Sequence, residues 1–150
     1  MSIVKQILTC ALLLSSICGT VVAQSVTNHS ARFNPSGEYH PLNKSTEARF
    51  VQFHLQVRHK RGQLVAWGEV VDVQFYRFRN VSVTEKHLRF STECRHGVSY
   101  NFEGSFLRGG NFTVASDTPG SFLLQGTLRK FINGKQVMEL TTPFVYYVGC

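Results

Sequence analysis

The stretch that decides the fold is residues 87–107, which read HLRFSTECRHGVSYNFEGSFL. Apolar and polar residues alternate from Leu88 to Cys94, and the alternation starts again at Val98 and continues to Phe106. A period of two over two runs is typical of two strands with one apolar and one polar face. Gly97 lies between the runs, where a tight turn is needed. The stretch therefore predicts an antiparallel β-hairpin.

Similar alternation continues on both sides of this hairpin, and no part of the chain after residue 23 keeps a 3.6-residue period. Further strands are predicted at 49–58, 63–79 (with a bulge near Gly68 or a break near Asp72), 78–84, 111–115, 121–132 and 135–150. Asn133-Gly134 is the strongest hairpin-turn signal. About eight strands with short connections predict an all-β fold, an antiparallel up-and-down β-barrel, with a β-sandwich as the alternative.

Length and composition favour one globular domain. The chain has 150 residues, of which 43% are hydrophobic, and this excludes a wholly disordered protein. The net charge is +7, which allows weak attraction to anionic surfaces or polymers. The basic cluster at 58–61 is interpreted as a solvated turn.

The N-terminus indicates export. One charged residue, Lys5, precedes a long apolar run, and Val21 and Ala23 occupy the small-residue positions before a cut at Gln24. We therefore expect a signal peptide at 1–23, a polar N-terminal arm at 24–48, a single barrel domain at 49–150 and a secreted or periplasmic location. A retained membrane anchor is the alternative, whereas cleavage leaves no stable membrane span.

Two cysteines, Cys94 and Cys150, remain after that cut. In an exported protein they are most simply one disulfide, and two free thiols are the alternative. The alternation places both cysteines on the apolar side of their strands or at its rim.

Four Asn-x-Ser/Thr sequons are candidate glycosylation sites in a host that modifies exported proteins. They begin at Asn28, Asn43, Asn80 and Asn111.

Signals for chemistry are weak. The six histidines show no metal-ligand spacing, and no nucleophile or phosphate-binding motif is present. Either Glu69 or Asp72 is expected to face inward, but a single inward carboxylate is more often structural than catalytic. The run Arg77-Phe78-Arg79 is too short to indicate base stacking. We therefore expect no metal, cofactor, catalytic residue or nucleic-acid partner.

The start Gly37-Glu38-Tyr39 and the Gly and aromatic positions between Tyr100 and Phe106 resemble the calycin superfamily of small lipocalin-like barrels. The resemblance covers most of residues 37–150 by pattern and implies a barrel. It identifies no binding residue.

The leading functional hypothesis is an exported, non-enzymatic barrel that binds a small, largely apolar ligand, because small barrels either fill with side chains or hold one ligand. The candidate lining residues are Phe53, Trp67, Phe90, Tyr100, Phe102, Leu124, Phe144 and Tyr146. One alternative is a solid-core structural or protein-interaction module. Another is an isomerase or cyclase that uses an inward carboxylate and Tyr100.

Overall fold

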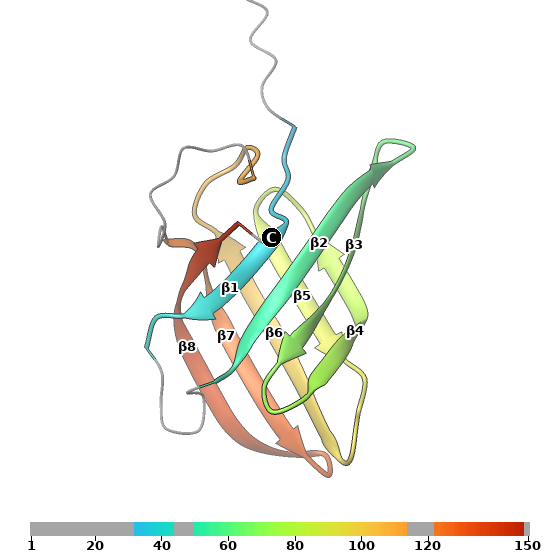
Figure 1. The fold of residues 1–150 in the computed structure, drawn as a ribbon, viewed down its shortest axis with the longest axis vertical. Helices are drawn as coiled ribbons and strands as arrows, with labels where there is room; N and C mark the ends of the chain where they lie inside the picture. Colours follow the sequence, from blue (N-terminus) through green and yellow to red (C-terminus); the bar gives the residue numbers. More distant parts are fainter. Residues whose placement is uncertain (1–31, 44–49, 114–121, 149–150) are drawn as a thin grey trace, which may run out of the picture.

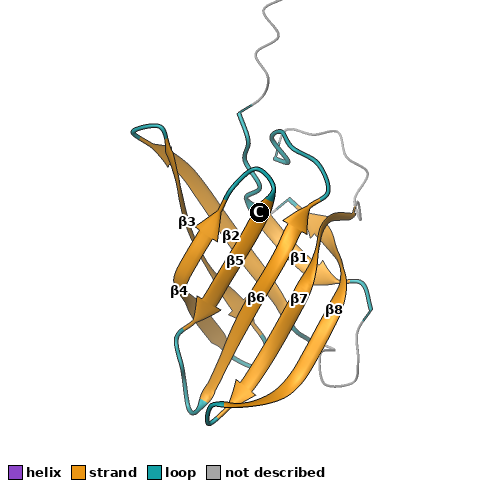
Figure 2. Cartoon of the chain, turned by 180° about the vertical axis from the view of Figure 1, so that it is seen from behind, coloured by secondary structure: helices purple, strands orange, loops and turns teal. Residues whose placement is uncertain are grey.

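A computed structural model of the chain describes residues 32–43, 50–113 and 122–148. Its strands run antiparallel and close into one barrel in chain order, so the expected up-and-down β-barrel is confirmed (Figures 1 and 2). The strands are β1 (Gly37–Pro41), β2 (Gln52–Lys60), β3 (Gln63–Val71), β4 (Phe75–Val83), β5 (His87–Thr92), β6 (Val98–Phe106), β7 (Phe122–Ile132) and β8 (Lys135–Tyr147).

Two-residue turns connect the strands of three hairpins, and the first of them is Arg61-Gly62 between β2 and β3, with φ angles of 50° and 83°. His96 and Gly97 between β5 and β6 have φ angles of 50° and 77°, and Asn133 and Gly134 between β7 and β8 have 50° and 79°. Positive φ at both central residues is the type I′ geometry, whose twist matches that of the flanking strands. The hairpin at 87–107 and the Asn-Gly turn are therefore confirmed.

The chain breaks at Asp72 rather than bulging at Gly68. β3 ends at Val71, and the Asp72 amide donates a hydrogen bond of 3.0 Å to the carbonyl of Gln74 before β4 begins. This break assigns Leu64, Ala66 and Val70 to the inner face of β3.

The barrel extends farther toward the N-terminus than the expected boundary at residue 49. β1 lies in the predicted polar arm, yet it pairs with both β2 and β8 and closes the sheet. Its five residues are too few to show a clear period. The strand expected at 111–115 is reduced to an isolated bridge between Asn34 and Asn111, and residues 114–121 lie outside the described residues.

Two tyrosines hold the closing strand. The Tyr39 hydroxyl donates to the Pro35 carbonyl at 2.6 Å, and the Tyr146 hydroxyl from β8 donates to the Ser36 carbonyl at 2.8 Å. Both rings are buried, so these bonds satisfy phenol groups that have left water. They tie the segment before β1 to the barrel end.

Two glycines make room for a buried ring. Gly104 on β6 and Gly126 on β7 face each other across the ladder. A Cβ atom at Gly126 would lie 2.5 Å from the Phe102 ring and 2.6 Å from the Glu103 carbonyl oxygen. The Phe102 ring therefore occupies the space that two side chains would otherwise fill.

Cys94 does not lie on the apolar side, so that prediction is wrong. β5 ends at Thr92, whose hydroxyl accepts the Tyr100 amide and donates to the Glu93 carbonyl. The alternation of the strand stops there, and Cys94 is an exposed, free cysteine. Cys150 lies outside the described residues, so the bridge is not seen and stays a prediction.

The export signals also lie outside the described residues, which begin at Arg32. Asn28 is among the residues not described; Asn43 and Asn80 are exposed and Asn111 is half-buried. Glycosylation at these sequons stays a prediction. Within the described part of the chain, no helix could span a bilayer.

Substitution of Gly126 by Ala should lower the free energy of unfolding by about 1–3 kcal/mol, because the added methyl group overfills the space beside Phe102. Gly109→Ala is the matched control, since a Cβ atom there would meet nothing within 4 Å. Urea denaturation of both variants measures the difference. Equal stabilities would contradict this account of the glycine pair.

Candidate functional site

The barrel interior is the first candidate site, and seven of the eight predicted lining residues are buried there. The buried residues are Phe53, Phe90, Tyr100, Phe102, Leu124, Phe144 and Tyr146. Their role in binding a ligand stays a prediction. The prediction for Trp67 is wrong. It points outward and is 46% exposed, because the break at Asp72 assigns the opposite parity of β3 to the interior.

The interior is filled by aromatic rings centred on Phe53. The ring centroid of Phe53 lies 5.0 Å from that of Tyr39, 5.2 Å from Phe90, 5.1 Å from Phe102 and 5.4 Å from Phe144. None of the five residues is more than 2% exposed. These separations are those of aromatic pairs in contact. We call these five residues the Phe53 cluster.

A second aromatic layer closes the end of the barrel where β1 begins. Phe33 packs edge-on against Phe106 and Phe112, with centroids 5.3 and 5.8 Å apart, and Phe112 lies 5.7 Å from Tyr146. The amide of Phe112 donates to the carbonyl of Asn34, which holds the two connecting segments together. This end of the barrel is therefore covered by side chains.

The opposite end holds a polar cluster of Asp72, Tyr100 and Lys130. The Tyr100 hydroxyl donates to Asp72 Oδ2 at 2.6 Å, and Lys130 Nζ lies 2.8 Å from the same oxygen. The Lys130 ammonium also lies 5.6 Å from the centre of the Tyr100 ring. Asp72 comes from the β3–β4 turn, Tyr100 from β6 and Lys130 from β7, so the cluster joins three parts of the barrel rim.

The electrostatics of this cluster oppose proton transfer near neutral pH. Burial raises the pKa of Tyr100, and the hydrogen bond to Asp72 and the charge of that carboxylate raise it further. Burial alone would raise the pKa of Asp72, but hydrogen bonds from Lys130 and Tyr100 and the Lys130 charge lower it overall. An acid or base is most effective when its pKa lies near the working pH. The arrangement therefore suits an ion pair that closes the rim.

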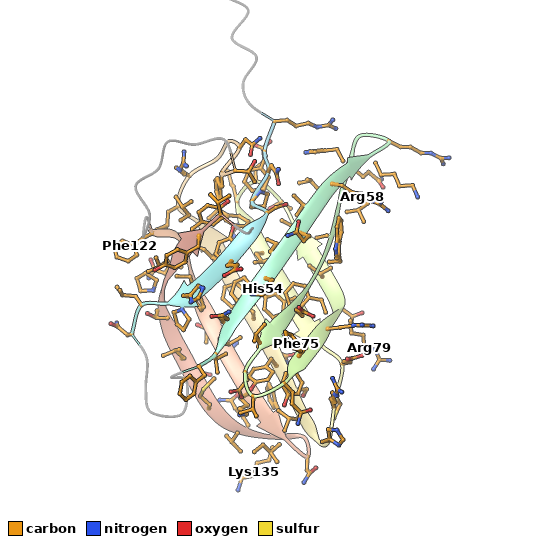
Figure 3. The ribbon with its side chains drawn as sticks, in the orientation of Figure 1. His54, Arg58, Phe75, Arg79, Phe122 and Lys135 are labelled. Carbon is orange, nitrogen blue, oxygen red and sulfur yellow. The ribbon has the colours of Figure 1, made fainter. Side chains whose placement is uncertain are left out.

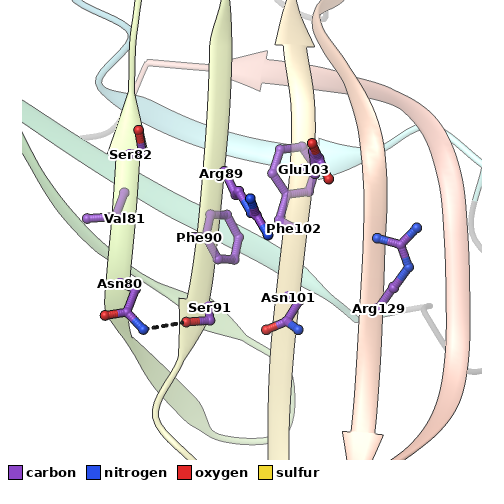
Figure 4. A pocket seen from close by; sticks show the side chains of 10 residues that line it. All are labelled: Asn80, Val81, Ser82, Arg89, Phe90, Ser91, Asn101, Phe102, Glu103 and Arg129. Carbon is purple, nitrogen blue, oxygen red and sulfur yellow. Dashed lines mark hydrogen bonds between the residues drawn. The ribbon is translucent and has the colours of Figure 1, made fainter.

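The outer surface carries a pocket of about 380 Å³ across β4, β5, β6 and β7 (Figure 4). Its side chains are mainly polar, with Arg89 and Glu103 facing each other across the β5–β6 ladder. Asn80 Nδ2 donates to Ser91 Oγ at 3.2 Å along one wall. A glycan on Asn80 would therefore lie at this pocket.

Histidines and carboxylates also gather on the outer face of β1, β2 and β3. His54 lies 3.8 Å from Glu38 and 3.9 Å from Glu69, and His40 lies 3.5 Å from Glu38. Among the described residues, no group of three or more His, Cys, Asp and Glu side chains has the geometry to hold a metal ion.

The sequence pattern predicted Tyr100 as an inward phenol and left Glu69 and Asp72 as alternatives for an inward carboxylate, but it did not lead us to Lys130. A signal for Lys130 was present, because it lies between Leu128 and Ile132 on the parity predicted to face the interior. A charge at such a position needs a partner of opposite sign. Comparisons of this chain with models of protein families, with curated proteins and with solved structures found no match.

Asp72→Asn should destabilise the protein at neutral pH by roughly 1–3 kcal/mol, because Tyr100 and Lys130 lose a charged acceptor. The pKa of Asp72 is lower in the folded protein than in the unfolded chain, where it is about 3.9. The Asp72 carboxylate therefore contributes its full stabilisation above that unfolded-chain pKa and loses it as the pH falls through the folded-state pKa. The stability difference between wild type and variant should therefore shrink below about pH 4. Urea titrations across pH measure it.

Glu139→Gln is the control, because it removes a carboxylate from the exposed pair with Arg129. Exposed pairs contribute little to stability. An equal loss in both variants, or a loss from Asp72→Asn that does not depend on pH, would contradict the assignment.

Proposed function

We propose that this protein is an exported, non-enzymatic binding module with a solid barrel interior, and that it recognises a macromolecular partner through its outer surface. The observation that carries the proposal is the Phe53 cluster, which fills the middle of the barrel with rings in mutual contact. An apolar ligand inside the barrel would have to displace at least one buried ring. Sites for small molecules are instead largely preformed cavities.

The outer surface offers the residue types that dominate protein interfaces. Trp67 on β3 is 46% exposed, and the guanidinium of Arg58 on β2 lies 5.6 Å from the centre of its ring. Tryptophan and arginine are enriched among the residues that contribute most to protein–protein binding. Phe75 on β4 is also exposed. These side chains support recognition from outside.

The compartment belongs to the proposal as well. The signal-peptide pattern of residues 1–23 supports export, and export would permit both the predicted disulfide and, in some hosts, the predicted glycans. The closed eight-stranded barrel is compatible with the calycin resemblance. That resemblance supplies no ligand.

A solid interior should leave the wild-type protein without a binding site for apolar probes. We expect no saturable binding of a naphthalene-type fluorescent probe, and native mass spectrometry of the purified protein should show the mass of the chain alone. Phe53→Ala is the positive control, because removing the central ring opens an apolar cavity that a small aromatic molecule can enter. Saturable binding of one probe per wild-type chain would contradict the proposal.

Phe53→Ala is expected to lower the free energy of unfolding by about 3–5 kcal/mol. Phe53→Leu removes less volume, and it replaces the alanine variant in this experiment if the latter does not fold.

Export predicts a mature chain that begins at Gln24. The full-length chain should be recovered outside the cytoplasm of a bacterial host, and intact-mass measurement should show the loss of residues 1–23. Ala23→Leu places a large residue beside the cut and should slow cleavage. Recovery of the uncleaved chain in the membrane fraction would favour a retained anchor instead.

A further inference from the structure

The barrel is closed, but β3 and β4 are paired along only part of their length. β3 pairs with β2 from Gln63 to Val71, but it pairs with β4 only at Glu69, Val70 and Val71. Residues 63–68 therefore have no strand partner on the β4 side among the described residues. The β2–β3 hairpin reaches past the end of β4, as Figures 1 and 2 show. We call residues 63–68 the open edge.

The ladder register shows which backbone groups the open edge presents. Lys60 and Gln63 flank the two-residue turn at Arg61 and Gly62, so they form the first hydrogen-bonded pair of the hairpin. Pairs then alternate, and Leu64 and Ala66 direct their N–H and C=O groups away from β2. The same alternation is visible on β2, where the Val57 amide opposite Ala66 leaves the ladder and donates to Ser36 Oγ at 2.9 Å.

The side chains beside the open edge form two different surfaces. Leu64 and Ala66 are half-buried and pack against the core, as do Val81 and Val83 on β4. Val65 and Trp67 point to the outside and are exposed. A strand laid along this edge would therefore place alternate residues on an apolar floor and the others beside Trp67.

The surroundings of the open edge are basic. Exposed basic residues lie on the β2–β3 hairpin, on β4 and on β5, namely Arg58, Lys60, Arg61, Arg77, Arg79 and Arg89. Figure 3 labels two of them, Arg58 and Arg79, on the same side of the molecule. The carboxylates among them include Glu69 on β3, Glu85 in the β4–β5 turn, Glu93 near Arg77 and Glu103 opposite Arg89, so the basic residues are in excess. Complementary charge favours an acidic partner.

Together these features indicate the chemistry of the partner that the open edge would bind. We propose that an extended acidic segment of another protein, with alternating acidic and apolar residues, adds to the open edge of β3 as a further strand. The segment pairs its backbone with Leu64 and Ala66, places its apolar side chains on the half-buried floor and directs its acidic side chains toward Arg58 and Arg79. Residues 63–68 extend over about 20 Å, which is enough for five or six partner residues. Strand addition to an exposed edge is an established mode of peptide recognition.

Two other occupants fit the surface less well. A second copy of this chain would bring two basic hairpins together, and residues 24–31 of the same chain contain no acidic residue. A nucleic acid would match the charge, but Phe78 is not available for stacking on a base. Its ring stacks inside on Phe90 at a centroid distance of 4.0 Å.

The inference rests on the proposed recognition from outside, and a peptide of four Glu-Val repeats with blocked ends tests it. Trp67 is the only tryptophan of the chain and lies on the open edge, so its fluorescence reports binding. In an antiparallel added strand, which is the orientation we propose, the Val side chains face Leu64 and Ala66 and the Val amides face β3. N-methylation of the Val amides should weaken binding about tenfold or more, whereas N-methylation of the Glu amides should leave most of it.

Protein variants supply a second set of controls. Ala66→Pro removes the amide that points away from β2, so it should weaken binding about tenfold while the β2–β3 ladder stays intact. Arg79→Glu should also weaken binding, by roughly fivefold or more. Lys135→Glu makes the same change of charge at the distant start of β8 and should stay within about twofold of wild type.

Hydrogen exchange locates the strand independently of the variants. The Leu64 and Ala66 amides should exchange rapidly in the free protein and become protected when the peptide is added. Two results would show a polyanion-binding surface and overturn the inference. One is that the peptide methylated at its Val amides binds as tightly as the unmethylated peptide. The other is that oligodeoxythymidine displaces the peptide and the peptide does not protect the Leu64 and Ala66 amides. Absence of peptide binding would overturn it too, while the proposed function would still be decided separately by the apolar-probe experiment.

Discussion

The structure depends on the packing of the Phe53 ring against aromatic rings from four other strands. Tyr39 comes from β1, Phe90 from β5, Phe102 from β6 and Phe144 from β8, so one buried side chain contacts partners around much of the barrel wall. This contact sets the spacing between opposite walls. It also explains the glycine pair at positions 104 and 126, because the Phe102 ring lies over these two adjacent positions of β6 and β7, where side chains would overlap it.

Under the proposed function, a filled interior separates the residues that stabilise this barrel from the residues that would recognise a partner. Aromatic packing holds the middle, the Phe33 layer covers one end, and the Asp72–Tyr100–Lys130 cluster joins the other rim. All three involve side chains that are needed to hold the fold. Residues that are free to evolve for binding are therefore those on the outside, where β3 carries an exposed tryptophan beside an arginine and leaves part of its backbone unpaired.

The sequence was most informative where alternation is long and turns are tight. The hairpin at 87–107 and the turn at Asn133 and Gly134 could be predicted because period and turn chemistry agree. Trp67 was misplaced because both parities of its strand are apolar, so only the position of the break at Asp72 determines the inner face. β1 forms because it pairs with β8, which is distant in the chain. Cys94 is exposed because β5 ends at Thr92, where a single hydroxyl group accepts the Tyr100 amide. Neither leaves a periodic signal.

The short strand β1 determines when folding can finish. It joins β2 on one side and β8 on the other, so the last seam of the barrel forms between its first and its last strand, which are far apart in the sequence. Contacts of such high sequence separation form slowly, since the intervening chain must first be ordered. A chain that has been synthesised only as far as β7 cannot close the sheet, and its unpaired strands stay exposed to aggregation. Completion of the barrel is thus a step that requires β1 and β8 to be present together.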